Sequence, residues 1–120
     1  MNGFIYGYTE DGAPITDVWE FERLLRDMGA RRVDHTDLAV VQVFTTNLLT
    51  DHNFTDPGRP PITFETWVEA LPHCPEQVAQ DWNNATFRYP NRVAAQAGHD
   101  QIVAEIKAAI AQYEAANKEG

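Results

Sequence analysis

The chain has 120 residues, a formal net charge of −9 and a hydrophobic fraction of 43%, a combination typical of one acidic globular domain. The acidic surplus argues against binding of long nucleic acid or an anionic membrane, because both partners require clustered Lys and Arg. A lone cysteine, Cys74, and the lack of a basic leader or long apolar run favour a cytoplasmic protein that is neither exported nor membrane-inserted.

The first elements in chain order are a short strand and a helix. Aromatic residues alternate within residues 3–9, and the turn signal Asp11-Gly12 follows, which predicts a strand that closes in a turn. Thr16 or Asp17 can cap the helix, and Gly29 is in the usual position to end it. The apolar stripe expected on this helix is Val18, Phe21, Leu24, Leu25 and Met28.

Alternating patterns in the middle of the chain predict three strands. Residues 31–37 and 39–48 are joined so tightly that an antiparallel hairpin is the simplest connection. A loop of about a dozen residues follows, stiffened by prolines, and a further strand spans residues 62–71. The faces expected for this strand are Ile62, Phe64, Thr66 and Val68 on one side, and Thr63, Glu65, Trp67 and Glu69 on the other.

The last third of the chain predicts a turn of helix within residues 72–84, a short edge strand over 85–89, and a long alanine-rich helix over 92–116. The fold expected from these elements is α+β, an antiparallel sheet of about four to five strands with two main helices packed on one face. One domain is expected to cover residues 1–116, with residues 117–120 as a frayed tail. The stripe expected on the long helix is His99, Val103, Ile106, Ile110 and Tyr113.

Asp51, His52 and Asn53 stand where a strand ends and a rigid loop begins, a place where side chains are exposed yet held by the scaffold. His52 can act as a general acid or base, or donate a hydrogen bond to a phosphate. The alternative is structural, because Asp and Asn side chains often tie a turn to the backbone.

Glu65 and Trp67 share a face of the predicted strand, and a carboxylate beside an indole suits the binding of a nucleobase or sugar. A solvated strand face has the same composition, so both interpretations stay open. Thr45 on the partner strand, together with Thr66, is a candidate to line the same site, although the register across the long loop is not fixed by the sequence.

His99 is a polar ring on an apolar stripe, so it must find a hydrogen-bond partner, either within the core or in a pocket. Gly98 before it suggests the close approach of another backbone or a ligand. Arg88 and Tyr89 lead towards this helix and, with Arg32, are candidates to bind phosphate and a base, while the alternative for Arg88 is an ion pair with Glu65. No histidine pair has metal-site spacing, so neither a metal nor another cofactor is expected.

The segments DHNF and PPITFETWV resemble a family of small proteins encoded by many tailed bacteriophages, typified by LDHNF, a glycine-rich loop and PP-x-x-FETMVF. The resemblance covers most of the chain. It includes an opening DG-x-PI turn, a helix with Trp19, an RRV strand, an RY pair and a GH pair. This chain departs from the family pattern at Leu49, which replaces a glycine, and at Asn47, which replaces an aromatic residue, while it keeps Thr45.

The resemblance implies a phage origin and a site, and gene context suggests a counter-defence protein in the cytoplasm of an infected bacterium. The leading hypothesis is a homo-oligomer that sequesters or cleaves a cyclic nucleotide immune signal in a pocket formed by the DHNF and FETWV hairpin and the GH helix. In the cleaving version, His52 and His99, helped by Glu65, act without metal on a phosphodiester. The alternatives are a structural or adaptor protein of the phage particle and an acidic inhibitor of a host nuclease.

Overall fold

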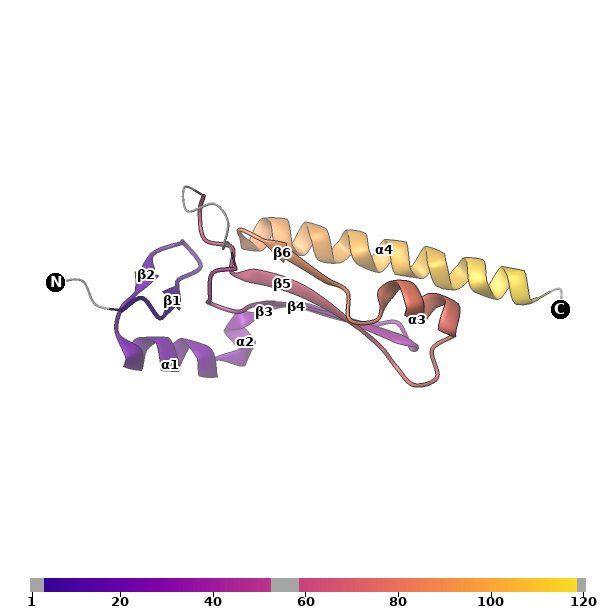
Figure 1. The fold of residues 1–120 in the computed structure, drawn as a ribbon, viewed down its shortest axis with the longest axis horizontal. Helices are drawn as coiled ribbons and strands as arrows, with labels where there is room; N and C mark the ends of the chain where they lie inside the picture. Colours follow the sequence, from indigo (N-terminus) through magenta and orange to yellow (C-terminus); the bar gives the residue numbers. More distant parts are fainter. Residues whose placement is uncertain (1–3, 53–58, 119–120) are drawn as a thin grey trace.

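The computed structural model describes residues 4–52 and 59–118, and its main feature is an antiparallel sheet of four strands in the order β3-β4-β5-β6 (Figure 1). These strands are β3 (Arg32–Asp37), β4 (Val41–Asn47), β5 (Phe64–Ala70) and β6 (Thr86–Tyr89). A smaller sheet consists of β1 (Gly7–Tyr8) and β2 (Pro14–Ile15). The expected α+β class, with the hairpin of β3 and β4 and a final edge strand, is confirmed.

Four helices accompany the sheets in the described part of the chain. They are α1 (Val18–Arg26), α2 (Met28–Arg31), α3 (Glu76–Trp82) and α4 (Arg92–Asn117). Helix α4 runs along one face of the four-stranded sheet and α3 packs beside it, whereas α1 lies with the small sheet at the far end of the molecule (Figure 1). None of these helices is both long and apolar enough to cross a membrane.

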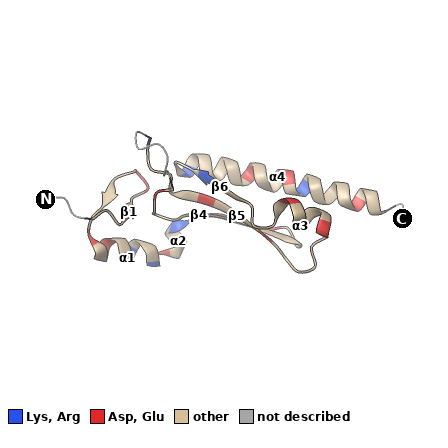
Figure 2. Ribbon diagram, in the orientation of Figure 1, with Lys and Arg blue, Asp and Glu red and all other residues tan. Residues whose placement is uncertain are grey.

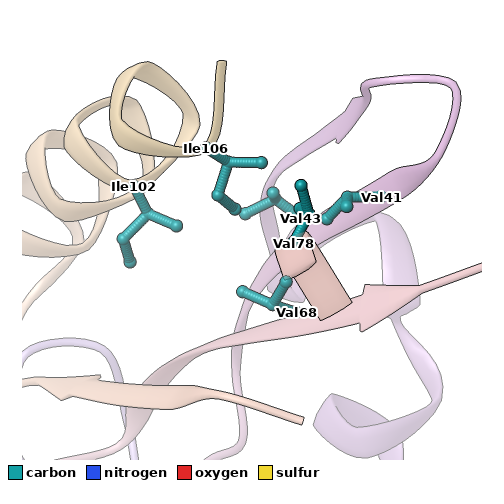
Figure 3. Packing of buried hydrophobic residues seen from close by; sticks show 6 residues of the cluster. All are labelled: Val41, Val43, Val68, Val78, Ile102 and Ile106. Atoms are coloured by element: carbon teal, nitrogen blue, oxygen red, sulfur yellow. The ribbon is translucent and has the colours of Figure 1, made fainter. Parts of the chain in front are cut away.

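The core lies between α4, α3 and the face of the sheet that they cover. Strand β4 buries every second residue, and β5 buries Phe64, Thr66 and Val68, as the alternation of the sequence predicts. The apolar part of this face meets two helices in one cluster (Figure 3), made of Val41, Val43, Val68, Val78, Ile102 and Ile106. Burial of these side chains fixes which sheet face is covered and which remains open.

The N-terminal helix is shorter than the sequence predicts. Asp17 caps it as expected, since its carboxylate accepts a hydrogen bond from the Trp19 backbone at 2.9 Å. The helix ends at Arg26 rather than at Gly29, because the Asp27 side chain accepts from the Ala30 backbone at 3.1 Å and starts the separate turn α2. The expectation that Met28 belongs to the buried stripe is therefore wrong, and Met28 is 60% exposed.

The small sheet and α1 form an N-terminal lobe that is attached to one end of the main sheet. The Tyr8 backbone donates to the Leu49 carbonyl at 2.7 Å, and a Cβ on Gly7 would come within 2.4 Å of that same oxygen. Arg92 of α4 pairs with Glu10 of the lobe at 2.6 Å. The result is an elongated molecule, 68 × 28 × 21 Å, with the lobe at one end and the end of α4 at the other (Figure 1).

Candidate functional site: the open face of the sheet

The residues that the sequence nominates as a site are divided between the two faces of the sheet. Paired residues of neighbouring strands share a face, and Thr45 pairs with Thr66, so both lie on the face covered by α4 and are buried. Glu65 and Trp67 lie on the opposite, open face of β5. A single pocket that includes all four side chains is therefore impossible in this fold.

His99 lies fully buried between α4 and the sheet, where both ring nitrogens have partners. Its Nδ1 lies 2.7 Å from the Thr45 hydroxyl and its Nε2 lies 2.8 Å from the Thr36 hydroxyl. Thr45 in turn lies 2.5 Å from the hydroxyl of Thr66. The desolvation cost of a buried imidazole is thus offset by hydrogen bonds, and His99 has no surface through which it can touch a ligand.

The environment of His99 favours the neutral ring. Burial lowers the pKa of His99, and the opposing attraction of Asp34, whose carboxylate lies 3.7 Å from Nε2, and of Asp100 is weaker. The pKa of Asp34 is lowered as well, chiefly by a hydrogen bond from the Gln96 side chain at 2.9 Å. His99 and Asp34 together form a polar contact between α4 and β3.

Asp51 and His52 lie where the two arms of the β4–β5 connection come together. The Asp51 carboxylate accepts from the Ile62 backbone at 2.9 Å, and the His52 backbone donates to the Ile62 carbonyl at 2.8 Å. The His52 ring Nε2 lies 3.5 Å from the Thr50 hydroxyl. Asp51 therefore ties the base of the loop, while Asn53 lies outside the described residues.

Tyr89 belongs to the covered face, away from Trp67. It pairs with buried Phe64, and its ring lies so close to Gly98 that a Cβ on that glycine would be 2.2 Å from the Tyr89 Cε1 atom. The expected close approach at Gly98 thus comes from an aromatic side chain. The Tyr89 hydroxyl is buried and has no hydrogen-bond partner in the described structure.

Three aromatic rings form a continuous row across the open face, which we call the aromatic row: His35 on β3, Phe44 on β4 and Trp67 on β5. The register pairs His35 with Phe44 and Phe44 with Trp67. The ring centroids are 4.5 Å and 5.0 Å apart, with interplanar angles of 9° and 21°, so the three rings stack side by side. Trp67 is 39% exposed, so part of this residue is available to solvent.

A second row of paired residues lies next to the aromatic row on the same face and crosses all four strands. This polar row consists of Arg32, Thr46, Glu65 and Arg88. Arg88 pairs with Glu65, with its Nε atom 3.2 Å from Oε2, and remains about half exposed. In the described chain Arg32 forms no ion pair, so a guanidinium at each edge of the face can meet an anion.

A pocket of about 320 Å³ lies where the two rows meet the end of the N-terminal lobe. Arg32, Phe44 and Trp67 line it directly. Arg31 also lines it, but its guanidinium is engaged by the carbonyls of Asn47 at 2.9 Å and Leu25 at 2.6 Å. Figure 2 shows basic segments at α2 and β6 on either side of an acidic segment in β5. The open face therefore combines a stacking surface with positive charge at both edges.

Sequence reasoning found Trp67, Glu65, Arg88 and Arg32 but missed His35 and Phe44. Both missed residues stand in strands that the alternation predicts. What was lacking was the register of β4 against β5, which aligns Phe44 with Trp67 across a long loop. The pairing of His35 with Phe44 lies within the predicted hairpin of β3 and β4, so this hairpin was the signal in the sequence that could have identified the two residues.

Comparisons with protein-family models, curated proteins and solved structures found no match. Among residues 4–52 and 59–118, no three His, Cys, Asp or Glu side chains are grouped as a metal ion would require. The geometry of the open face thus provides the argument for function.

Proposed function

We propose that this protein binds and sequesters a small nucleotide-type ligand on the open face of the sheet. The observation that carries the proposal is the aromatic row, three stacked rings that end at the partly exposed Trp67, beside guanidinium groups at both edges of the sheet. A base stacks on Trp67, Arg32 and Arg88 hold phosphate, and Glu65 accepts from the edge of the base.

The energetics favour a small ligand over a polymer. Stacking of one base on an aromatic side chain contributes about 1–3 kcal/mol, and two charge-assisted contacts to phosphate add to it. The pocket of about 320 Å³ has a volume suited to part of a mononucleotide or cyclic dinucleotide. A net charge of −9 repels a long polyanion, whereas two local arginines suffice for one or two phosphates.

Sequestration is favoured over cleavage by the position of His99. Acid–base cleavage requires two groups within reach of one phosphorus atom, and His99 is fully buried with both nitrogens bonded to threonine hydroxyls. His99 therefore cannot act together with His52 on a ligand. The similarity to phage proteins suggests the biological setting, in which an invading phage captures a cyclic nucleotide signal of the host before its receptor does.

The test is incubation of the purified protein with cyclic di- and trinucleotides, followed by analysis of the ligand before and after heat denaturation. Sequestration predicts that intact ligand is retained by the folded protein and released on heating. A linear product contradicts sequestration. Absence of both binding and turnover across the common signals contradicts the whole proposal.

A second candidate is an adaptor protein of the phage particle, and it is favoured by the N-terminal lobe. There Trp19 is 74% exposed and Phe4 is 71% exposed, and exposed apolar side chains of this size often mark a protein contact. Substitution Trp19→Ala separates the candidates. An adaptor predicts loss of particle assembly with Trp19→Ala, whereas sequestration predicts that this variant retains ligand and that Trp67→Ala loses it.

A further inference from the structure

The two edges of the main sheet differ in how well they are protected. Strand β3 has an irregular register between Arg32 and Asp34, carries the charges of Asp34 and Asp37, and meets Arg92, which donates to the Arg32 carbonyl at 3.3 Å. Bulges, charges and covering side chains are the devices that prevent an edge strand from pairing. The β3 edge is therefore blocked.

The opposite edge, β6, has neither a bulge nor a covering side chain in the described chain, and its one charge, Arg88, is paired with Glu65 of β5. In the described chain β6 pairs with β5 alone, its register is regular, and its sequence Thr-Phe-Arg-Tyr has high strand propensity without proline or acidic residues. Thr86, Phe87 and Arg88 are all exposed, with Phe87 at 39%. An edge of this kind, although only four residues long, offers backbone donors and acceptors to another strand.

We propose that β6 pairs antiparallel with β6 of a second copy of this chain, so that the two sheets join into one of eight strands. Two-fold symmetry and a shared sheet face require a register centred on one residue, and centring on Phe87 or on Arg88 keeps the most residues of β6 paired. Centring on Arg88 would place two guanidiniums opposite each other, which destabilises a cross-strand pair. Centring on Phe87 pairs the two rings and places each Arg88 opposite Thr86.

This register selects a second copy over a foreign strand, because the four residues are complementary to themselves when reversed. The exposed Phe87 ring is covered by its equivalent, and every Arg88 faces an uncharged partner. Thr86 pairs with Trp67 on the open face, so Arg88 of one copy lies two strands from Trp67 of the other, with Thr86 between them. The position of Arg88 near Trp67 of the other copy matters for ligand binding only under the proposed function, whereas the pairing itself does not depend on that function.

Sedimentation velocity of the full chain tests the pairing. The wild type is expected at twice the chain mass of 13.5 kDa, and Phe87→Glu, which places two carboxylates opposite each other, is expected as a folded monomer. Val93→Glu is the matched control, because Val93 is 82% exposed on α4, and it is expected to remain a dimer. A monomeric wild type, or a dimer that survives Phe87→Glu, overturns the proposal.

Cross-linking tests the register without relying on the stability of Phe87→Glu. In a Cys74→Ser background, Phe87→Cys is expected to give a disulfide-linked dimer under mild oxidation, and Arg88→Cys is expected to give far less. Efficient cross-linking through Arg88→Cys with none through Phe87→Cys overturns the register. Failure of the nucleotide assay together with an intact dimer overturns the proposed function alone, so the two outcomes are distinguishable.

Discussion

Leu49 shows how a single backbone conformation connects the N-terminal lobe to the sheet. Its φ is 65°, in the left-handed region, and it is nevertheless a buried leucine with 3% exposure. Its N–H donates to the Asn47 side chain at 3.0 Å, and its carbonyl accepts from Tyr8. Glycine is the residue to which this conformation costs least, so the buried leucine combines backbone strain with apolar burial.

The strain at Leu49 predicts that glycine is more stable than alanine at this position, the reverse of the usual order of stability. Both Leu49→Ala and Leu49→Gly lose apolar burial, at a cost of about 2–5 kcal/mol. Because glycine relieves the positive φ, Leu49→Gly is expected to be more stable than Leu49→Ala by about 1 kcal/mol, as measured by urea unfolding. At the neighbouring Leu48, whose φ is not positive, the same pair serves as control and alanine is expected to be the more stable. The same order at both positions would contradict the account.

His99 makes the stability of the fold depend on pH. Its pKa is lowered by burial, so the unfolded state binds a proton more readily than the folded state does. The stability contributed by the neutral ring is complete above the unfolded pKa of about 6.5 and is lost progressively as the pH falls below it. The lowered pKa of Asp34 affects the stability of the fold only at lower pH, below about 4.

Urea unfolding between pH 7.5 and pH 5 tests the role of His99. The wild type is expected to lose stability across this range, and His99→Gln, which keeps a polar side chain but cannot be protonated, is expected to lose less. Subtraction of the two curves removes the contribution of the other histidines. A parallel pair of curves would show that His99 titrates alike in the folded and unfolded states, contrary to its burial.

Among the elements, α4 and β6 meet through the contact of Gly98 with Tyr89. Glycine within a helix is unfavourable by about 1 kcal/mol relative to alanine, but here the missing side chain lets the Tyr89 ring lie against the helix backbone. The same contact holds the edge strand next to the helix. Close approach therefore outweighs helix propensity at this position.

Replacement of this glycine tests that balance. Gly98→Ala is expected to lower the melting temperature, because the new Cβ would lie 2.2 Å from Tyr89 and the ring must move. Gly29→Ala in α2 is the matched control, since its nearest atom is 3.9 Å away, and it is expected to be neutral or stabilising by up to about 1 kcal/mol. Equal changes in melting temperature for the two substitutions would show that contact with the Tyr89 ring does not determine the effect at Gly98.

At this scale the sequence predicts most of the architecture but not the site. Alternation identified the two faces of β5, and the periodicity of α4 placed His99 among Ile106 and its neighbours in the buried stripe. These patterns record what each element buries. They contain no information on which residues of different strands are neighbours, so the aromatic row of His35, Phe44 and Trp67 emerged only from the register.

In the molecule as a whole, the covered face of the sheet stabilises the fold and the open face presents accessible side chains. One face holds the core and the hydrogen-bonded His99, which stabilise the fold. The other carries the aromatic row and the polar row, which remain accessible. This division predicts that substitutions on the covered face change stability, whereas substitutions of exposed residues on the open face change ligand binding and leave the fold intact.

Titration calorimetry of cyclic nucleotides with the variants Trp67→Ala and Trp19→Ala tests the central claim most directly. Both variants remove an exposed indole, but Trp67 alone belongs to the aromatic row. Loss of one stacked base predicts that Trp67→Ala weakens binding by roughly 5- to 150-fold, while Trp19→Ala binds as the wild type does. Wild-type affinity in Trp67→Ala would contradict the assignment of the open face as the binding site.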